Sequence, residues 1–183
     1  MVGPAHVSGW GPSGTQTGLV IREERPDDER AVRAVNEAAF GRSAEADLVD
    51  RLRLDGAVLV SLVAEQDGFL VGHVLFSRIS IEAAGGPVPS VALAPLAVLP
   101  ANQRRGIGGR LVAFGLEWLR RHGERSVLVL GHPHYYQRFG FSTDGARMLI
   151  VPFPAEAFMA LEMVPDALHG VRGAVRYPAA FGL

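Results

Sequence analysis

A strand-like segment, a basic glycine loop and an amphipathic helix follow one another in the middle of the chain. The loop, residues 103–108, reads Gln-Arg-Arg-Gly-Ile-Gly, and it joins the apolar residues 91–99 to the helical pattern of residues 107–122. Glycines let the backbone adopt conformations that a side chain blocks, and a helix N-terminus presents free N–H groups to an anion. The arrangement therefore predicts a unit that binds a phosphate-bearing ligand.

Neither of the two common nucleotide-binding loops accounts for these residues. A P-loop needs Lys followed by Ser or Thr after its glycines, and a dinucleotide loop needs a third glycine with a later acidic residue. This loop has neither feature. Arg104 and Arg105 instead place two positive charges beside the start of the helix.

Composition limits the class of protein further. The chain has 183 residues, no cysteine and a formal net charge of −1. That charge gives no support for a nucleic-acid or membrane-surface partner, and no apolar run is long enough to span a membrane. The absence of cysteine removes disulfides and thiolate chemistry and fits a reducing compartment. With no signal-peptide pattern at the N-terminus, we expect a cytoplasmic protein.

We expect a flexible N-terminal tail at residues 1–18 and a single domain at residues 19–183. The tail is rich in Gly, Ser, Thr and Pro and has no hydrophobic period, which is typical of a disordered segment. The rest of the chain shows neither an internal repeat nor a second domain boundary, and its length suits one full-sized core.

Hydrophobic periodicity predicts strands mixed with helices in the domain. Asp67-Gly68 predicts a β-hairpin turn, and Pro95, which cannot donate to a sheet ladder, predicts a bulge or an unpaired edge in its strand. The predicted strands are residues 19–22, 58–65, 69–82, 91–99, 126–130, a segment from 141 onward and 158–164. The predicted helices begin at Pro26 and after a cap at Ser43, and span residues 107–122 and 133–139. The inner face of the helix 107–122 is predicted to carry Ile107, Leu111, Phe114, Gly115, Trp118 and Leu119.

Two segments give the chain a family resemblance. Residues 103–108 match the Gln/Arg-x-x-Gly-x-Gly/Ala signature of the GCN5-related N-acetyltransferases (GNAT), and residues 134–141, His-Tyr-Tyr-Gln-Arg-Phe-Gly-Phe, resemble that family's Tyr-x-x-x-Gly-Phe segment. The ending of the chain resembles a YhbS-type bacterial subgroup. The resemblance implies an α/β (α+β) fold: a mixed, mostly antiparallel, splayed sheet with helices on both faces.

The resemblance also implies that acetyl-CoA binds at the loop and donates an acetyl group to an amine. The pyrophosphate is expected on the backbone N–H groups from Arg104 to Gly109, with the Gln103 side chain nearby. The pantetheine is expected to pair with the strand backbone, which Pro95 leaves free. The cofactor-binding residues on this view are Leu96, Ala97, Val98, Gln103, Arg104, Arg105, Gly106, Ile107, Gly108 and Gly109, and the backbone N–H near Val98 would stabilise the oxyanion.

Tyr136 is the candidate catalytic residue. It matches the family tyrosine that protonates the leaving thiolate, and a phenol within hydrogen-bond reach of that sulfur can donate a proton to it. The alternative is a core tyrosine whose hydroxyl is satisfied by the backbone. Its neighbour Tyr135 is expected to serve packing.

A general base is harder to find in the sequence. Many family members use a glutamate on the fourth strand, but residues 91–96 contain no acid. His73 is a candidate because a histidine titrates near neutrality, and a satisfied core histidine is the alternative. Glu23, Glu24 and Ser90 are weaker candidates, and an acceptor amine of low pKa needs no strong base.

Two further features have more than one interpretation. His132-Pro133-His134 invites a metal site, but no third ligand is evident, so we expect no metal, and this segment can instead lie beside the cofactor. Arg120, Arg121 and Arg125 form either a solvated basic helix end or a contact to the 3′-phosphate.

The acceptor, a small-molecule or peptide amine, is not identified by any motif. Its specificity is expected in residues 40–46 and 81–91 and in the C-terminal strands, where Met148, Phe153, Phe158 and Met159 can line either an acceptor site or the core. A non-catalytic acyl-CoA-binding or regulatory module is the alternative to an enzyme, and a nucleotide-binding protein is a more distant one. The oligomeric state stays open, and a homodimer is compatible with the sequence.

Overall fold

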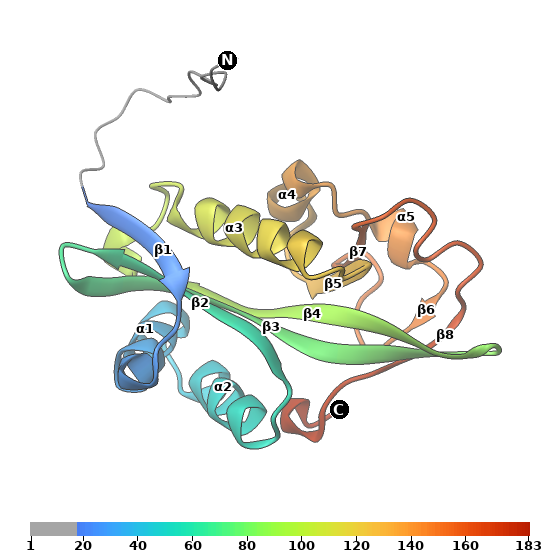
Figure 1. Ribbon diagram of the computed structural model, residues 1–183, viewed down its shortest axis with the longest axis horizontal. Helices are drawn as coiled ribbons and strands as arrows, with labels where there is room; N and C mark the ends of the chain where they lie inside the picture. Colours follow the sequence, from blue (N-terminus) through green and yellow to red (C-terminus); the bar gives the residue numbers. More distant parts are fainter. Residues whose placement is uncertain (1–17) are drawn as a thin grey trace, which may run out of the picture.

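A mixed, mostly antiparallel sheet organises the computed structural model, which describes residues 18–183 (Figure 1). The main path of the sheet runs β1-β2-β3-β4-β5-β7, and β8 pairs with both β3 and β6. Only the β4/β5 and β6/β8 pairs are parallel. The strands are β1 (Leu19–Glu23), β2 (Val58–Gln66), β3 (Phe69–Ala83), β4 (Gly86–Val98), β5 (Ser126–Leu130), β6 (Leu149–Ile150), β7 (Phe158–Glu162) and β8 (Gly173–Arg176).

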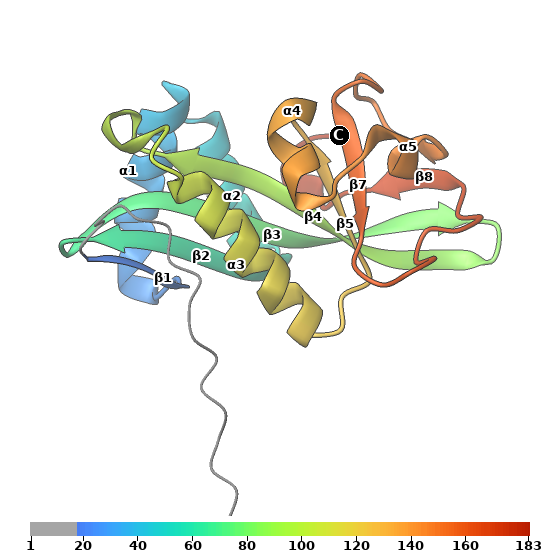
Figure 2. The same cartoon turned by 90° about the horizontal axis from the view of Figure 1, so that it is seen from above.

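Helices cover both faces of this sheet, as predicted. Figure 1 shows α3 on one face and α1 with α2 on the other, and Figure 2 shows α3 lying across the strands. The α-helices are α1 (Glu29–Phe40), α2 (Ala44–Leu54), α3 (Ile107–Arg121), α4 (Pro133–Tyr136) and α5 (Thr143–Ala146). Short 3₁₀ turns occur at Pro26–Asp28 (η1), Pro100–Asn102 (η2), Gln137–Phe139 (η3) and Ala179–Phe181 (η4). Within residues 18–183, no helix is long and apolar enough to cross a membrane.

Local signals in the sequence account for several of these elements. The predicted Asp67-Gly68 hairpin is confirmed, since both residues have positive φ, 52° and 82°, between β2 and β3. Gly123, with φ 77°, follows the end of α3 and donates its N–H to the Arg120 carbonyl, as a helix C-terminus favours. Ser43 precedes α2 as predicted, but its side chain makes no capping bond and instead donates to Asp47.

The strand β4 carries the irregularity that Pro95 predicted. Its register against β3 shifts between the pairs Val74–Leu96 and Phe76–Leu93, so β4 holds one more residue than β3 over this stretch. An extra residue of this kind is a β-bulge, which bends the strand. On its other edge, β4 pairs with β5 at only two positions, Val91–Val127 and Ala92–Leu128. Beyond them, β4 and β5 separate.

Other predictions were wrong. β4 begins at Gly86 rather than at residue 91, because residues 86–90 form a hairpin arm that pairs with β3. Pro87 and Pro89 in this arm are unfavourable for a strand, so its sequence did not predict one. The segment from residue 141 is mainly the short helix α5, with a single bridge from Ser142 to β7, and β8 was not predicted. Phe114 is 43% exposed, because the buried face of α3 includes Val112 and Leu116 instead. The predicted tail lies outside the described residues, apart from Gly18.

A glycine sets how closely α3 approaches the sheet. Gly115 lies on the buried face of α3, and a Cβ built there would overlap the ring of Phe76 on β3. The Phe76 ring is fully buried among side chains from β2, β4 and α3, so it has little room to move aside. The absence of a side chain at residue 115 therefore allows the helix to rest directly on an aromatic ring.

We predict that Gly115→Ala destabilises the fold, although alanine favours helix by about 1 kcal/mol. Overpacking a tight core costs about 1–3 kcal/mol, and the neighbour here is a confined ring, so the free energy of unfolding should fall by roughly 1–2 kcal/mol. The control is Gly85→Ala, where a Cβ meets nothing within 4 Å. Urea denaturation checks both variants, and an unchanged or raised midpoint for Gly115→Ala would refute the packing argument.

Candidate active site

A cavity of about 790 Å³ lies where β4 and β5 separate. One side is the outer part of β4, with Leu96 and Val98. A second side is the loop before α3 and the first turn of that helix. The segment after β5 and the end of α1 close the cavity through Gly131, His132 and Phe40. The divergence of the two strands thus produces a wedge that no strand of residues 18–183 fills.

The free edge of β4 turns backbone groups toward this cavity. The Leu99 N–H donates to Val71 of β3, and alternate residues of a strand direct their polar groups to the same edge. Leu96 and Val98 therefore direct theirs away from β3. The Val98 carbonyl accordingly accepts a hydrogen bond from the Gln103 side chain at 3.0 Å. Ala97, between them, is buried and faces His73 in the register of β3.

The loop between β4 and α3 is shaped to receive an anion. Arg104 has φ 59° and Gly106 has φ 81°, and an arginine in the left-handed region is a strained conformation, which is often found at ligand sites. Gly106 is the N-cap residue of α3, and no side chain caps the helix there. The first N–H groups of α3 and the positive end of its dipole thus open into the cavity.

Arg138, from the segment after β5, lies over this helix start and beside the ring of Tyr135. The Arg138 guanidinium lies 4.1 Å above the Tyr135 ring centre and 4.8 Å from that of Phe139. Its Nη2 is 3.2 Å from a Cβ position built at Gly109. A cation is unfavourable at the positive end of a helix unless an anion accompanies it. The placement of Arg138 therefore supports an anion site at the N-terminus of α3.

Gly108 permits the close approach on this side. A Cβ at Gly108 would lie 2.7 Å from the Tyr135 hydroxyl, 3.6 Å from Val98 and 3.8 Å from Leu96. The bare backbone of residue 108 thus faces the free edge of β4 across a narrow part of the cavity. A side chain at residue 108 would therefore displace the Tyr135 hydroxyl from its place beside α3.

Tyr136 also lines the cavity. The residue is 8% exposed, its ring packs edge-on against Tyr135 and Phe141, and no hydrogen bond from its hydroxyl is found within residues 18–183. Burial, followed by the neighbouring Tyr135, raises the pKa of the Tyr136 hydroxyl well above its usual range, so the phenol stays protonated at neutral pH. It is a buried donor at a cavity wall.

Most of the sequence-predicted site residues meet in this cavity. Its lining includes Leu96, Val98, Gln103, Arg104, Gly106, Ile107, Gly108, Gly109 and Tyr136, whereas Ala97 and Arg105 are not part of it. Sequence reasoning missed Tyr135, Arg138, Gly131, Asn102 and Ala39 as lining residues. The signal for Tyr135 and Arg138 was present in the Tyr-x-x-x-Gly-Phe segment, but only the packing of that segment on α3 shows that their side chains face the ligand site.

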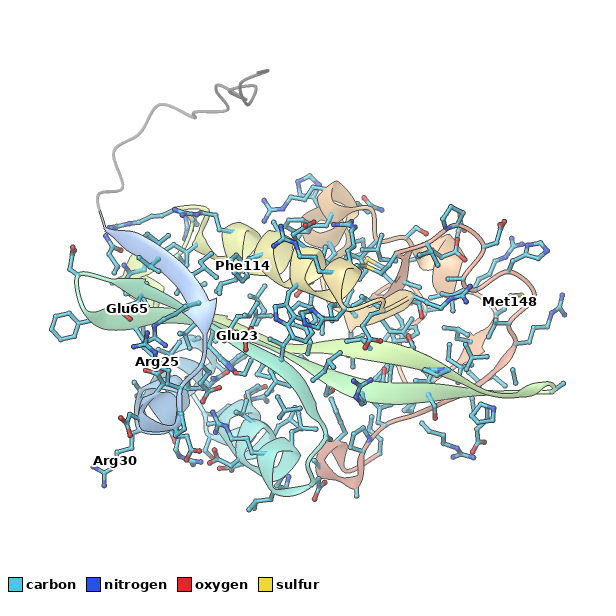
Figure 3. The ribbon with its side chains drawn as sticks, in the orientation of Figure 1. Glu23, Arg25, Arg30, Glu65, Phe114 and Met148 are labelled. Atoms are coloured by element: carbon cyan, nitrogen blue, oxygen red, sulfur yellow. The ribbon has the colours of Figure 1, made fainter. Side chains whose placement is uncertain are left out.

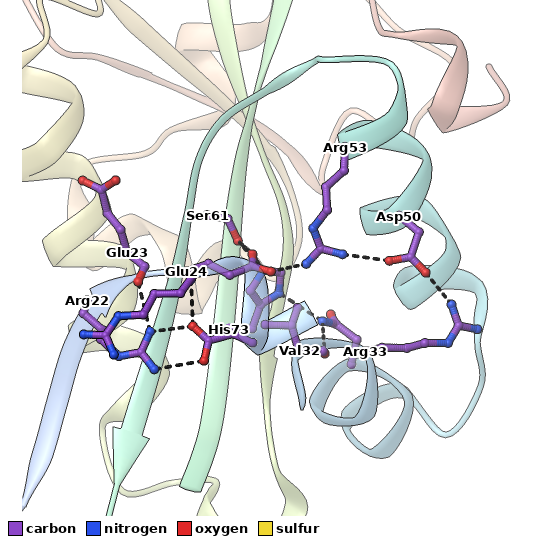
Figure 4. A network of polar contacts seen from close by, with 12 residues as sticks. Arg22, Glu23, Glu24, Val32, Arg33, Asp50, Arg53, Ser61 and His73 are labelled. Carbon is purple, nitrogen blue, oxygen red and sulfur yellow. Dashed lines mark hydrogen bonds and ion pairs between the residues drawn. The ribbon is translucent and has the colours of Figure 1, made fainter. Parts of the chain in front are cut away.

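His73 is not in the cavity. It is completely buried on β3, under α1 and α2, within a chain of hydrogen bonds (Figure 4). Asn36 Nδ2 can only donate, and it bonds the Val32 carbonyl at 2.9 Å and His73 Nδ1 at 3.0 Å. The proton of His73 is therefore on Nε2, which donates to Ser61 Oγ at 2.9 Å. Ser61 in turn donates to Glu24, which pairs with Arg53.

This network makes His73 a structural residue. Burial, followed by the positive charge of Arg53, lowers the pKa of His73 to about 3. A neutral imidazole with both nitrogens bonded has no free position for a substrate proton. The core-histidine interpretation thus fits the structure, and the interpretation of His73 as a general base does not.

The weaker base candidates also have other partners. Glu24 belongs to the His73 network, Glu23 accepts from the Trp118 indole at 2.8 Å, and Ser90 bonds Ser126 at 2.8 Å in the core. None of the three lines the cavity.

The arginine cluster lies at the end of α3, and the histidine pair follows β5. Arg120 and Arg121 pair with Glu117 on the surface of α3. Within residues 18–183, no group of three or more His, Asp or Glu is placed to hold a metal ion.

The apolar residues near the C-terminus lie elsewhere. Phe153 and Phe158 line a second cavity beside α5 and β6, while Met159 is buried in the main core. Met148 lies at the opposite end of the molecule from Glu65 and Arg25 in Figure 3. Phe40, in contrast, reaches the cavity between β4 and β5, so of the predicted acceptor segments the start of residues 40–46 lies at the site.

The mixed, mostly antiparallel sheet, splayed between β4 and β5 and covered by helices on both faces, is the architecture of the GNAT acetyltransferase fold. Comparison with known proteins agrees: the model of the acetyltransferase (GNAT) domain matches residues 20–143. The chain belongs to the GNAT acetyltransferase family.

Its relatives include uncharacterized bacterial N-acetyltransferases. YhbS of Escherichia coli strain K12 is 37% identical over 166 residues, covering 89% of this chain and 98% of YhbS. The crystal structure of E. coli YhbS in complex with CoA has a TM-score of 0.85 at 35% identity and covers 94% of this chain and 97% of that one. The crystal structure of a GNAT family acetyltransferase from Brucella melitensis in complex with acetyl-CoA has a TM-score of 0.76 at 40% identity. The match covers 89% of this chain and 97% of that one.

The buried histidine makes the stability of the fold depend on pH. Below pH 6.5 the unfolded chain binds a proton at His73 that the folded chain excludes, so the free energy of unfolding should fall as the pH drops from 6.5 toward 3. We predict a loss of about 2 kcal/mol between pH 7 and 5, above the range where most carboxylates titrate. Urea denaturation at stepped pH measures this loss.

Two variants assign that pH dependence to its source. His134→Gln, at an exposed histidine, should leave the slope unchanged. His73→Gln should be less stable at pH 7, because Asn36 and Ser61 lose their partner, and its stability should change less between pH 7 and 5. An equal slope in wild type and His73→Gln would contradict the pKa of His73 stated above.

Proposed function

We propose that the chain is an N-acetyltransferase that moves an acetyl group directly from acetyl-CoA to an amine. The observation that carries this proposal is the cavity itself, in which a free strand edge, an uncapped helix start and a protonated tyrosine meet. The three features suit the amide-bearing arm, the phosphates and the thioester of one ligand. Coenzyme A in the E. coli YhbS structure and acetyl-CoA in the Brucella structure support the assignment.

The phosphates of acetyl-CoA would bind where α3 begins. The backbone N–H groups of Ile107, Gly108 and Gly109 are the first of the helix and have no side-chain cap. Oxygen atoms of a pyrophosphate can accept hydrogen bonds from such groups. Arg104, from the loop, and Arg138, from η3, would add charge-assisted bonds from two sides.

The pantetheine arm would lie along β4. Its two amide groups can pair with Leu96 and Val98 as a neighbouring strand would, which satisfies backbone groups that otherwise face the cavity. Phe40 and Leu96 supply apolar contacts on either side. The arm then directs the thioester away from α3 and toward Tyr136 and the end of β5.

The chemistry then follows from the groups at that end. The acceptor nitrogen attacks the thioester carbonyl, forming a C–N bond and an oxyanion, and a backbone N–H at the free edge of β4 that is not paired with the pantetheine is the proposed donor to that oxyanion. Collapse of this intermediate breaks the C–S bond, and Tyr136 donates its proton to the sulfur. The Tyr136 hydroxyl suits this role because it is buried, protonated and without a competing partner among the described residues.

Tyr136→Phe tests this assignment. Removing the hydroxyl should lower kcat by about 10²- to 10⁴-fold, the usual range for a lost general acid, while the ring keeps its packing against Phe141. Acetyl-CoA binding should be nearly intact by isothermal titration calorimetry. Turnover is measured as thiol release from acetyl-CoA with a panel of alkyl- and arylamines.

A matched control and three contrary results define the test. Tyr177→Phe removes a hydroxyl at a half-buried tyrosine outside the cavity and should leave kcat unchanged. Equal losses of binding and rate in Tyr136→Phe would count against the acid role. Wild-type protein that binds acetyl-CoA but releases no thiol with any amine would favour a non-catalytic module, and stabilisation by ATP rather than by acetyl-CoA would favour a nucleotide-binding protein.

A further inference from the structure

Acetyl transfer to an alkylamine needs a base that takes a proton from the acceptor nitrogen. An alkylamine is protonated at neutral pH, and its ammonium form has no lone pair with which to attack a carbonyl. His73, Glu23, Glu24 and Ser90 lie outside the cavity, and its lining, within residues 18–183, contains no carboxylate. The group that takes the proton must therefore come from another residue type or from another part of the site.

Among the histidines of residues 18–183, His132 is the one that lines the cavity. It lies two residues after the end of β5 and immediately before α4, and its backbone carbonyl accepts the N–H groups of Tyr135 at 2.9 Å and Tyr136 at 3.2 Å. These bonds hold the backbone of His132 against the turn that carries the proposed acid. The contact is close, since a Cβ at Gly131, the preceding residue, would overlap the Tyr136 ring.

The imidazole of His132 is available for chemistry. It is exposed, and no hydrogen bond to either ring nitrogen is found in the part of the chain that the structure describes. It thus differs from His73, whose nitrogens are both bonded in the core. Histidine is the side chain that ordinarily exchanges a proton between pH 5 and 8.

We propose that His132 is the general base that deprotonates an acceptor amine of the alkylamine class, which is protonated at neutral pH. This inference rests on the proposed function, because it names the group that prepares the acceptor for the same transfer. Two residues of one turn then act at two different steps. His132 removes a proton from the acceptor nitrogen, and Tyr136 donates a proton to the sulfur of the leaving thiolate.

The protons balance in this scheme. The acceptor enters as an ammonium group, and one N–H proton passes to His132 and then to water from the exposed imidazole. The free amine attacks, the C–N bond forms, and the C–S bond breaks as Tyr136 protonates the sulfur. A second proton from the same nitrogen returns to the Tyr136 oxygen. The products are an amide, coenzyme A with a free thiol, and one proton released.

The first experiment tests the position of His132 without any acceptor. Diethylpyrocarbonate modifies accessible histidines, and mass spectrometry measures the rate at each position. We expect acetyl-CoA to slow the modification of His132 several-fold and to leave His134, two residues away and exposed outside the cavity lining, unchanged. Equal rates at His132 with and without saturating acetyl-CoA would overturn the proposal.

The second experiment tests the proton transfer. His132→Gln should lower kcat/KM with alkylamines by about 10²- to 10⁴-fold and flatten the ascending limb of the pH profile of kcat/KM. With an arylamine, which is already unprotonated at pH 7, the same variant should stay within a few-fold of wild type. His134→Gln is the matched control and should behave as wild type with both amines.

The outcomes separate the inference from the proposed function. If wild type turns over alkylamines and His132→Gln matches His134→Gln, the base assignment is overturned and the acetyltransferase function stands. If His132→Gln loses the same factor with alkylamines and arylamines, His132 positions the site rather than moving a proton, and the proposal is wrong. If wild type releases thiol with neither class of amine, the proposed function fails, and the role of His132 fails with it.

Discussion

The separation of β4 from β5 is the constraint on which the rest of the site depends. The two strands pair at only two positions before the bulge at Ala94-Pro95 bends β4 away. A strand edge left open in this way normally invites a second chain, but here it faces a wedge enclosed by α3, α1 and the segment after β5. The free edge of β4 at Leu96 and Val98, where only the Val98 carbonyl has a partner in the Gln103 side chain, is thus the proposed template for a ligand that carries amide groups.

The other half of the site depends on where α3 is held. Gly115 lets the helix rest on Phe76, and Trp118 ties its outer side to Glu23 of β1. The helix start therefore opens at the wedge, and the strained turn at Arg104 and Gly106 directs the loop around it. Arg138, far along the chain, reaches the same place through its stacking on Tyr135. An anion at this point offsets the repulsion among these positive groups.

Much of this could be predicted from local signals. The strand, loop and helix around residues 103–108, the hairpin at Asp67 and the bulge near Pro95 each follow from residue types whose backbone preferences are strong. The His73 network could not be predicted in the same way, since a lone histidine in an apolar strand is compatible with a base and with a core residue until its neighbours on α1 and β2 are known. The same holds for Tyr135 and Arg138, whose roles depend on the packing of α4 and η3 against α3. β8 escaped prediction because its short segment has weak periodicity and takes its place by pairing with β3.

The central claim is that acetyl-CoA completes the sheet at β4, and amide hydrogen exchange measured residue by residue by NMR tests it most directly. At saturating acetyl-CoA, exchange should slow at the Leu96 and Val98 amides and in the first turn of α3, and it should not change at Ala97, whose amide already faces β3. Saturated binding that leaves exchange at Leu96 and Val98 unaltered would contradict the account.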